Sequence, residues 1–168
     1  MTQPITFNHE AAIAALAQTL RQQGLKLATA ESCTGGLIAA ACTELAGSSD
    51  WFERGVVSYS NEAKTELLGV PEALIAQHGA VSEPVARAMA EGALRHGKAQ
   101  VSVAVTGVAG PSGGSAAKPV GTVWFGFSVH GQIHSEVQRF AGDRAAVRQA
   151  TVAHALQRLL ELLGPRGH

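Results

Sequence analysis

Residues 26–47 read KLATAESCTGGLIAAACTELAG, and this stretch decides the fold. The apolar residues Leu27 and Ala28 predict a short strand, and the alanine-rich sequence that follows the two glycines, up to Ala46, predicts a helix. Between strand and helix lies the polar run of residues 31–34. A strand that leads directly into a helix is typical of α/β proteins, and the remaining chain can be read outward from this junction.

Strand and helix patterns alternate through most of the chain. Apolar runs predict strands at 54–59 and 100–106, and a hairpin turns at His130 and Gly131. Helical spacing and capping residues predict helices over 8–24, 61–69, 71–79, 82–97 and 143–163. We therefore predict a single domain, 1–168, of the α/β class. Its expected architecture is a three-layer α/β/α sandwich with a mostly parallel mixed sheet and a C-terminal hairpin plus helix.

The composition narrows the classes of function. Thirteen Lys and Arg residues balance thirteen Asp and Glu residues, which gives no overall field favouring nucleic acid or an anionic membrane. Cys33 and Cys42 fit neither a zinc motif nor a disulfide framework, and the seven histidines form no ligand pair. With no leader pattern and no apolar run of membrane-spanning length, we expect a cytoplasmic protein without metal, nucleic-acid or membrane partners.

Polar and small residues follow each of the three predicted strands of the parallel part of the sheet. Ligands of open α/β sheets bind beyond the carboxyl ends of the parallel strands, so these residues are the candidates for a binding site. They are Ser32, Thr34 and Gly35 after the first strand, Tyr59, Asn61 and Lys64 after the second, and Thr106, Gly107 and Gly110 after the third.

Lys64 is the most informative of these residues. With Asn61 as the expected helix cap, Lys64 is the third residue of its helix, where a cation opposes the helix dipole. This position and partial burial would both lower the pKa of the lysine, and a neutral lysine can act as a general base. Ser32, Tyr59 and Lys64 then predict a nucleophile, a proton relay and a base. On these residues alone, a capping Ser32 and a solvated Lys64 remain open.

Other groups can bind a developing negative charge or a phosphate. Backbone N–H groups at the start of the junction helix, or those of Thr106 and Gly107, can hold an oxyanion. The glycine-rich loop 107–121 would let the backbone approach a ligand closely. Arg144 and Arg148, one helical turn apart, can present guanidinium forks to a phosphate or carboxylate.

Several motifs stand in the order of one known family. The segments AESCTGG (30–36), YSNEAK (59–64), VTGVAG (105–110) and GDR (142–144), with others between them, closely resemble the CinA C-terminal domain family. The similarity runs from about Leu25 to Leu163. Within the family, the chain is most similar to the stand-alone members, which are nicotinamide-nucleotide amidohydrolases.

This resemblance implies a reaction and roles for particular residues. The reaction is hydrolysis of the carboxamide of nicotinamide mononucleotide to nicotinic acid mononucleotide and ammonia, without a cofactor. Ser32 falls on the nucleophile of the family, and Lys64 with Tyr59 falls on the activating pair. Thr106, Gly107 and Arg144 fall in motifs of the pocket. The family also suggests a homo-oligomer.

Two rival interpretations remain. Cys33 could be the nucleophile instead of Ser32, because a thiol at a helix start tends toward a low pKa. The chain could also be a non-catalytic nucleotide-binding module or sensor, which would bind the nucleotide without turning it over.

Overall fold

The computed structural model describes residues 8–164, and residues 1–7 and 165–168 of the expected domain lie outside the described residues. The sheet has five strands in the order β2-β1-β3-β4-β5. β1 pairs parallel with β2 and β3, whereas β4 pairs antiparallel with β3 and β5. The expected mostly parallel mixed sheet is therefore confirmed, with β4 as the reversed strand. The strands are β1 (Leu27–Glu31), β2 (Phe52–Val57), β3 (Val101–Gly107), β4 (Thr122–Val129) and β5 (Gln132–Arg139).

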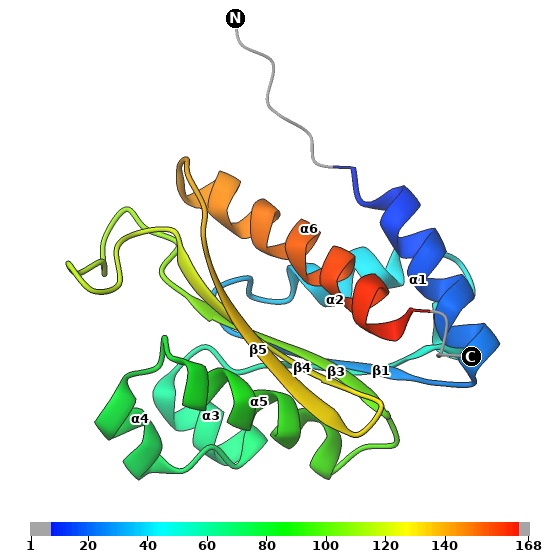
Figure 1. Cartoon of the computed structure of the whole chain (residues 1–168), viewed down its shortest axis with the longest axis horizontal. Coiled ribbons are helices and arrows are strands. Elements are labelled where there is room, and N and C mark those ends of the chain that lie inside the picture. Colours follow the sequence, from blue (N-terminus) through cyan, green and yellow to red (C-terminus); the bar gives the residue numbers. More distant parts are fainter. Residues whose placement is uncertain (1–7, 165–168) are drawn as a thin grey trace, which may run out of the picture.

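Helices cover both faces of the sheet, which confirms the three layers (Figure 1). One face carries α1 (Glu10–Gln23), α2 (Leu37–Thr43) and α6 (Arg144–Leu163); the other carries α3 (Asn61–Leu68), α4 (Glu72–His78) and α5 (Glu83–Arg95). A short 3₁₀ helix, η1 (Ser48–Asp50), precedes β2. Each face has its own cluster of buried apolar residues, so the sheet separates two cores.

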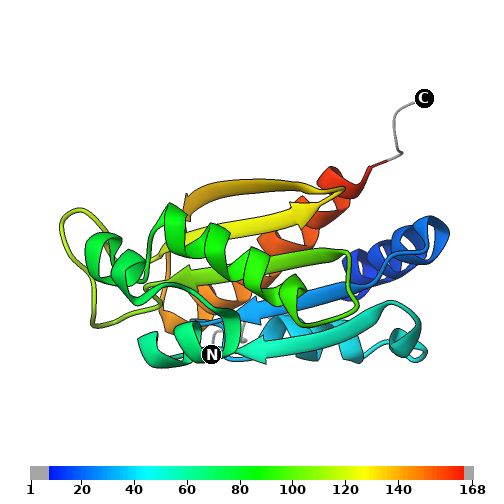
Figure 2. The same ribbon diagram turned by 90° about the horizontal axis from the view of Figure 1, so that it is seen from below.

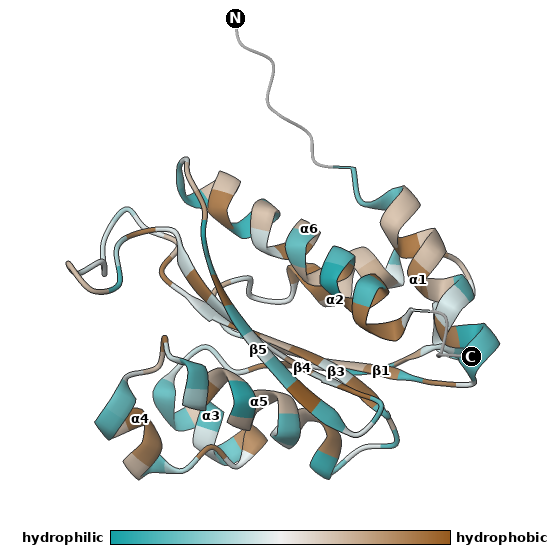
Figure 3. Cartoon of the chain, viewed as in Figure 1, coloured by the Kyte–Doolittle hydropathy of each residue, from teal (hydrophilic) through white to brown (hydrophobic). Residues whose placement is uncertain are grey.

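The hydrophobic pattern explains why the helices lie on the sheet. In α1, Ile13, Leu16 and Leu20 are buried at helical spacing, and Gly24 ends the helix in the left-handed conformation. Figure 3 shows the same division, since the helices alternate between hydrophilic and hydrophobic residues along their length. The hairpin turns at His130 and Gly131, both with positive φ, as the sequence predicts.

Three local predictions are wrong. The second strand, β2, spans Phe52–Val57 rather than 54–59, so the chain has left the strand before Tyr59. The junction helix α2 ends at Thr43 rather than Ala46, because the chain turns through a left-handed Gly47 into η1. Ser60, not Asn61, caps α3: its backbone is extended and its hydroxyl accepts a hydrogen bond from the N–H of Ala63. Asn61 is already the first helical residue, which makes Lys64 the fourth residue of α3.

The carboxyl ends of β1, β2 and β3 lie at the same edge of the sheet (Figure 2). β1 ends at Glu31, directly before Ser32, and β2 ends at Val57, two residues before Tyr59. The loop that follows β3 extends from this edge as well. The topology thus gathers the three groups of candidate residues, as expected for an open α/β sheet.

Candidate active site

Ser32 and Lys64 meet at this edge of the sheet. The Nζ of Lys64 lies 3.0 Å from the Oγ of Ser32. The same amine donates to the backbone carbonyls of Ser58, at 3.0 Å, and Tyr59, at 3.2 Å. Lys64 is only 1% exposed, whereas Ser32 keeps 8% of its surface exposed. The hydroxyl of Ser32 is therefore in contact with a buried amine at the carboxyl ends of the strands.

Burial favours the neutral form of the Lys64 amine. Removal from water lowers the pKa of Lys64 from its ordinary value, because a low dielectric disfavours the ammonium form. None of the hydrogen bonds described for its amine goes to a carboxylate; the acceptors are two carbonyls and the Ser32 hydroxyl. The direction agrees with the prediction from sequence. A neutral lysine in this place can accept the Ser32 proton directly.

Tyr59 takes a different position from the predicted relay. Its phenol ring is exposed, and its hydroxyl accepts a hydrogen bond from the Nη2 of Arg144 at 3.1 Å. The backbone carbonyl of Tyr59, rather than the phenol, faces Lys64 and lies 3.5 Å from the Oγ of Ser32. Since Lys64 contacts Ser32 directly, no hydroxyl relay is needed between them.

Glu31, which the sequence reasoning left without a role, organises the turn that carries Ser32. It is fully buried at the end of β1, and its carboxylate accepts a hydrogen bond from the Oγ1 of Thr34 at 2.6 Å. It also accepts from the N–H groups of Ile38 at 2.8 Å and Ala39 at 3.0 Å, in the first turn of α2. The hydroxyl of Thr34 therefore faces Glu31. In the sequence, the signal for this role was the acidic residue directly before the serine of the strand-to-helix junction.

The two arginines hold backbone carbonyls of the site. Arg148 donates to the carbonyls of Cys33 at 3.2 Å and Thr34 at 3.1 Å. Arg144 donates to the carbonyl of Gly110 at 2.9 Å and to the hydroxyl of Tyr59. Arg148 thus braces the Ser32 turn, and Arg144 ties the glycine-rich loop to the segment after β2.

Backbone N–H groups next to Ser32 remain available. Among the described residues, the N–H groups of Cys33 and Thr34 donate to no other residue, although the N–H of Cys33 lies against its own thiol, whereas the N–H of Gly35 donates to the carbonyl of Ser32 at 3.0 Å. Donors of this kind, placed beside a nucleophile, can stabilise an oxyanion. At the alternative position, the Oγ1 of Thr106 donates to the carbonyl of Ala80, and Gly107 is the last residue of β3.

Cys33 lies in an environment unsuited to a nucleophile. Its side chain is 6% exposed, and burial raises the pKa of its thiol to about 11. The helix start that would have lowered this pKa lies four residues further on, at Leu37. Burial therefore disfavours the rival interpretation of Cys33 as an activated thiol.

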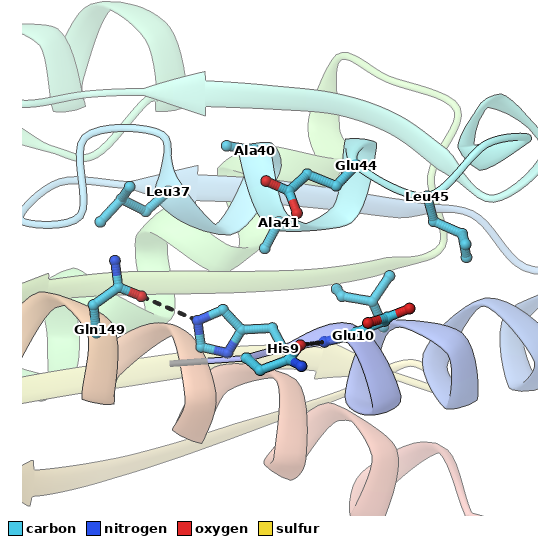
Figure 4. Close-up of a pocket in the computed structure, with 10 residues that line it drawn as sticks. His9, Glu10, Leu37, Ala40, Ala41, Glu44, Leu45 and Gln149 are labelled. Atoms are coloured by element: carbon cyan, nitrogen blue, oxygen red, sulfur yellow. Dashed lines mark hydrogen bonds between the residues drawn. The ribbon is translucent and has the colours of Figure 1, made fainter. Parts of the chain in front are cut away.

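Neither of two hollows in the structure contains the Ser32–Lys64 pair. A cavity of about 600 Å³ lies between α1, α2 and α6, and its lining includes Ile13, Leu37, Glu44 and Gln149 (Figure 4). A smaller one of about 220 Å³ lies between α3 and α4. Asn61 lines this second hollow, whose lining does not include Ser32.

Within residues 8–164, no group of three or more His, Cys, Asp or Glu side chains is arranged to hold a metal ion. In the same part of the chain, none of the helices has the length and apolar character needed to cross a membrane.

The fold and the site together define a class of protein. An α/β sheet that presents a serine hydroxyl to a buried amine, with free N–H groups beside it, has the groups required for nucleophilic hydrolysis. The chain belongs to the CinA C-terminal domain family, whose model matches residues 9–163. The resemblance read from the motifs is thereby confirmed.

Known proteins are similar along nearly the whole chain. The chain is 54% identical over 143 residues to nicotinamide-nucleotide amidohydrolase PncC of Escherichia coli K12, which covers 84% of this chain and 87% of that protein. It is also 54% identical to PncC of Pseudomonas putida, over 88% of this chain and 92% of that protein. The crystal structure of competence/damage inducible protein CihA from Agrobacterium tumefaciens superposes with a TM-score of 0.91, at 42% identity, over 97% of this chain and 100% of that chain.

Proposed function

We propose that this protein hydrolyses the carboxamide of nicotinamide mononucleotide to nicotinic acid mononucleotide and ammonia. The observation that carries the proposal is the 3.0 Å contact between the buried amine of Lys64 and the hydroxyl of Ser32. The nature of the substrate rests on the relatives, which are named nicotinamide-nucleotide amidohydrolases and are 54% identical to this chain over the aligned residues.

The first half of the reaction forms an acyl-enzyme. Neutral Lys64 removes the proton of Ser32 while the Oγ attacks the carboxamide carbon. The N–H groups of Cys33 and Thr34 donate to the oxyanion that develops on the carboxamide oxygen. The C–N bond then breaks, and the ammonium form of Lys64 returns its proton to the leaving nitrogen, which departs as ammonia.

The second half regenerates the enzyme. Lys64, again neutral, removes a proton from a water molecule that attacks the acyl carbon. The ester bond to Ser32 breaks, the Oγ regains its proton from Lys64, and the carboxylic acid that forms releases its remaining proton to water and leaves as the carboxylate. The positively charged pyridinium ring withdraws electrons from the carboxamide and favours both attacks. No cofactor takes part in either half.

The substrate is held by groups distant from the reacting carbon. We assign the ribose phosphate to the glycine-rich loop with Gly107 and Gly110, and to Arg144. Arg144 already joins this loop to Tyr59, which supports its place at the substrate. Thr106, Gly35 and Asn61 stay secondary candidates for contacts with the substrate. Binding energy from the phosphate can help to position the carboxamide.

The proposal includes the setting of the enzyme. We take the chain as one domain that acts in the cytoplasm as a homo-oligomer. Both cysteines are free, which suits a reducing compartment. Val57, in the edge strand β2, and Leu67, in α3, are exposed apolar side chains, and such residues suit an interface between copies.

Ammonia release tests the proposal. Purified protein is incubated with nicotinamide mononucleotide, beside the variants Ser32→Ala and Lys64→Met, and both ammonia and the acid product are measured. Release by the wild type, and its loss in both variants, would support the reaction and the two roles. If the wild type releases no ammonia yet the nucleotide raises its melting temperature, the chain is a binding module instead.

A further inference from the structure

The carboxylate of Glu31 stands at the centre of the Ser32 turn. It is 0% exposed, and all three of its described hydrogen bonds come from the chain segment just after Ser32. Two of these donors are backbone N–H groups of α2, and the third is the hydroxyl of Thr34. Charge-assisted hydrogen bonds of this kind are shorter and stronger than neutral ones, so a buried carboxylate can fix the path of a short loop.

Arg148 acts on the same turn through carbonyls. Its guanidinium donates to the carbonyls of Cys33 and Thr34. The peptide bond between these two residues is trans, and the C=O and N–H of a trans peptide point in opposite directions. The N–H of Thr34 therefore points away from Arg148. The orientation of this peptide decides where one free donor beside Ser32 is aimed.

We propose that Glu31 is a positioning residue for the reaction. It holds Thr34 and the start of α2 so that the Oγ of Ser32 stays in contact with Lys64 and the N–H of Thr34 stays free for the oxyanion. Its charge is used for the geometry of the turn, and it exchanges no proton with the substrate. The inference rests on the proposed function only where the test measures turnover of the substrate, because the contacts of Glu31 exist without a substrate.

The test compares Glu31→Gln and Glu31→Ala with the wild type. An amide in place of the carboxylate offers one oxygen where two now accept hydrogen bonds, so Glu31→Gln weakens the turn and Glu31→Ala removes all three contacts. We expect kcat for ammonia release to fall by about 10²-fold in Glu31→Ala and by less in Glu31→Gln, as for a misplaced reacting group. KM should stay within about threefold, because the phosphate contacts are untouched.

A matched control separates position from stability. Ser102→Ala removes a buried hydroxyl that donates to the carbonyl of Ala90 in α5, on the other face of the sheet. It should lower the melting temperature while kcat stays unchanged. A second readout needs no amide substrate. It is the rate constant at which a fluorophosphonate labels Ser32, divided by the fraction of folded protein, and Ser32→Ala serves as the blank. This rate should fall in both Glu31 variants and stay normal in Ser102→Ala.

The outcomes are distinct. If the wild type is labelled at Ser32 but releases no ammonia, the proposed function fails, and the labelling rates of the variants still decide the role of Glu31. If Glu31→Ala does not fold, Glu31→Gln and Thr34→Val give the same comparison. Unchanged labelling and unchanged kcat in folded Glu31 variants would overturn the inference and leave Glu31 as a residue of stability alone.

Discussion

Two regions of the molecule differ in size and in chemistry: the cavity between α1, α2 and α6, and the junction that carries Ser32. The cavity between α1, α2 and α6 measures about 600 Å³ and has the size of a ligand site. Its lining mixes apolar side chains with the carboxylates of Glu10 and Glu44 and lacks a serine or lysine. The Ser32 junction is tight and nearly buried, yet the hydroxyl of Ser32, the proposed nucleophile, contacts an amine whose pKa is lowered.

The difference shows which observation identifies the chemistry. The cavity offers space, but its described lining contains no hydroxyl or amine that could form a nucleophile and base like those proposed at the junction. At the junction, burial lowers the pKa of Lys64, and its amine contacts the hydroxyl of Ser32, so the packing that closes the site also favours the neutral form that the proposed base requires. Substitutions in the two regions should therefore have effects of very different size.

The largest effect is expected for Ser32→Ala. Without the hydroxyl no acyl-enzyme can form, and kcat for ammonia release should fall by at least about 10³-fold. Cys33→Ala is the matched control, because it changes the next residue, whose thiol has a raised pKa. Steady-state kinetics measure both. A loss in Cys33→Ala that equals the loss in Ser32→Ala would return the thiol to consideration.

Lys64→Met comes next, with an expected loss of about 10²–10⁴-fold, the usual contribution of a general base. In the wild type, kcat/KM should rise with pH as Lys64 loses its proton, and level off below the ordinary lysine pKa of about 10.4. In Lys64→Met this rise should vanish. If kcat/KM of the wild type still rises at pH values around the ordinary lysine pKa, the pKa of Lys64 is not lowered in the folded enzyme.

Lys64 should also make the stability of the folded protein depend on pH. Its pKa is lower in the folded than in the unfolded chain, so the unfolded chain binds the extra proton between the two values. The free energy of unfolding of the wild type, relative to Lys64→Met, should rise with pH through this window by at most about 1.4 kcal/mol per pH unit. Urea unfolding at several pH values measures it. A difference that falls with pH would contradict the assigned shift.

Arg144→Lys should cause a smaller loss. Lysine can replace one of the two hydrogen bonds of Arg144 but cannot span both Gly110 and Tyr59. We expect kcat/KM to fall about tenfold, or about 1.4 kcal/mol, chiefly through KM. Arg139→Lys, at the exposed end of β5, is the control and should match the wild type. If the two variants behave alike, the bridge made by Arg144 does not serve the substrate.

The smallest effect is expected in the cavity. Glu10→Gln and Glu44→Gln change exposed residues of its lining and should alter kcat/KM by less than about twofold. The same ammonia assay checks them. An increase of tenfold or more in KM would mean that the nucleotide binds in this cavity, and the contrast between the two regions would then be wrong.

The sequence was sufficient for the architecture because its signals are local. Helical spacing in α1, the turn at His130 and Gly131, and polar residues after apolar strands all depend on neighbours in the chain. The three strand ends then had to meet at one edge, since parallel strands end on the same side. On this ground Ser32 and Lys64 became candidates for a catalytic pair, and the family resemblance then favoured the pair over a capping Ser32 and a solvated Lys64.

Side-chain partners that come from distant segments could not be read in the same way. Whether the phenol of Tyr59 faces Lys64 or Arg144 depends on a rotamer, and Arg144 is 85 positions away in the chain. The cap of α3 shifted by one residue because Ser60 and Asn61 are both good caps. Glu31 was missed because its partners become visible only when α2 is in place.

Trapping the acyl-enzyme tests the central claim most directly. Wild-type protein is mixed with nicotinamide mononucleotide, quenched with acid within the first turnover, digested and mapped by mass spectrometry. We expect the acyl group on Ser32 in the peptide that contains residues 30–36, and none in Ser32→Ala. Ammonia release with the acyl group on Cys33, or with no covalent intermediate in a burst-phase experiment, would contradict nucleophilic attack by Ser32.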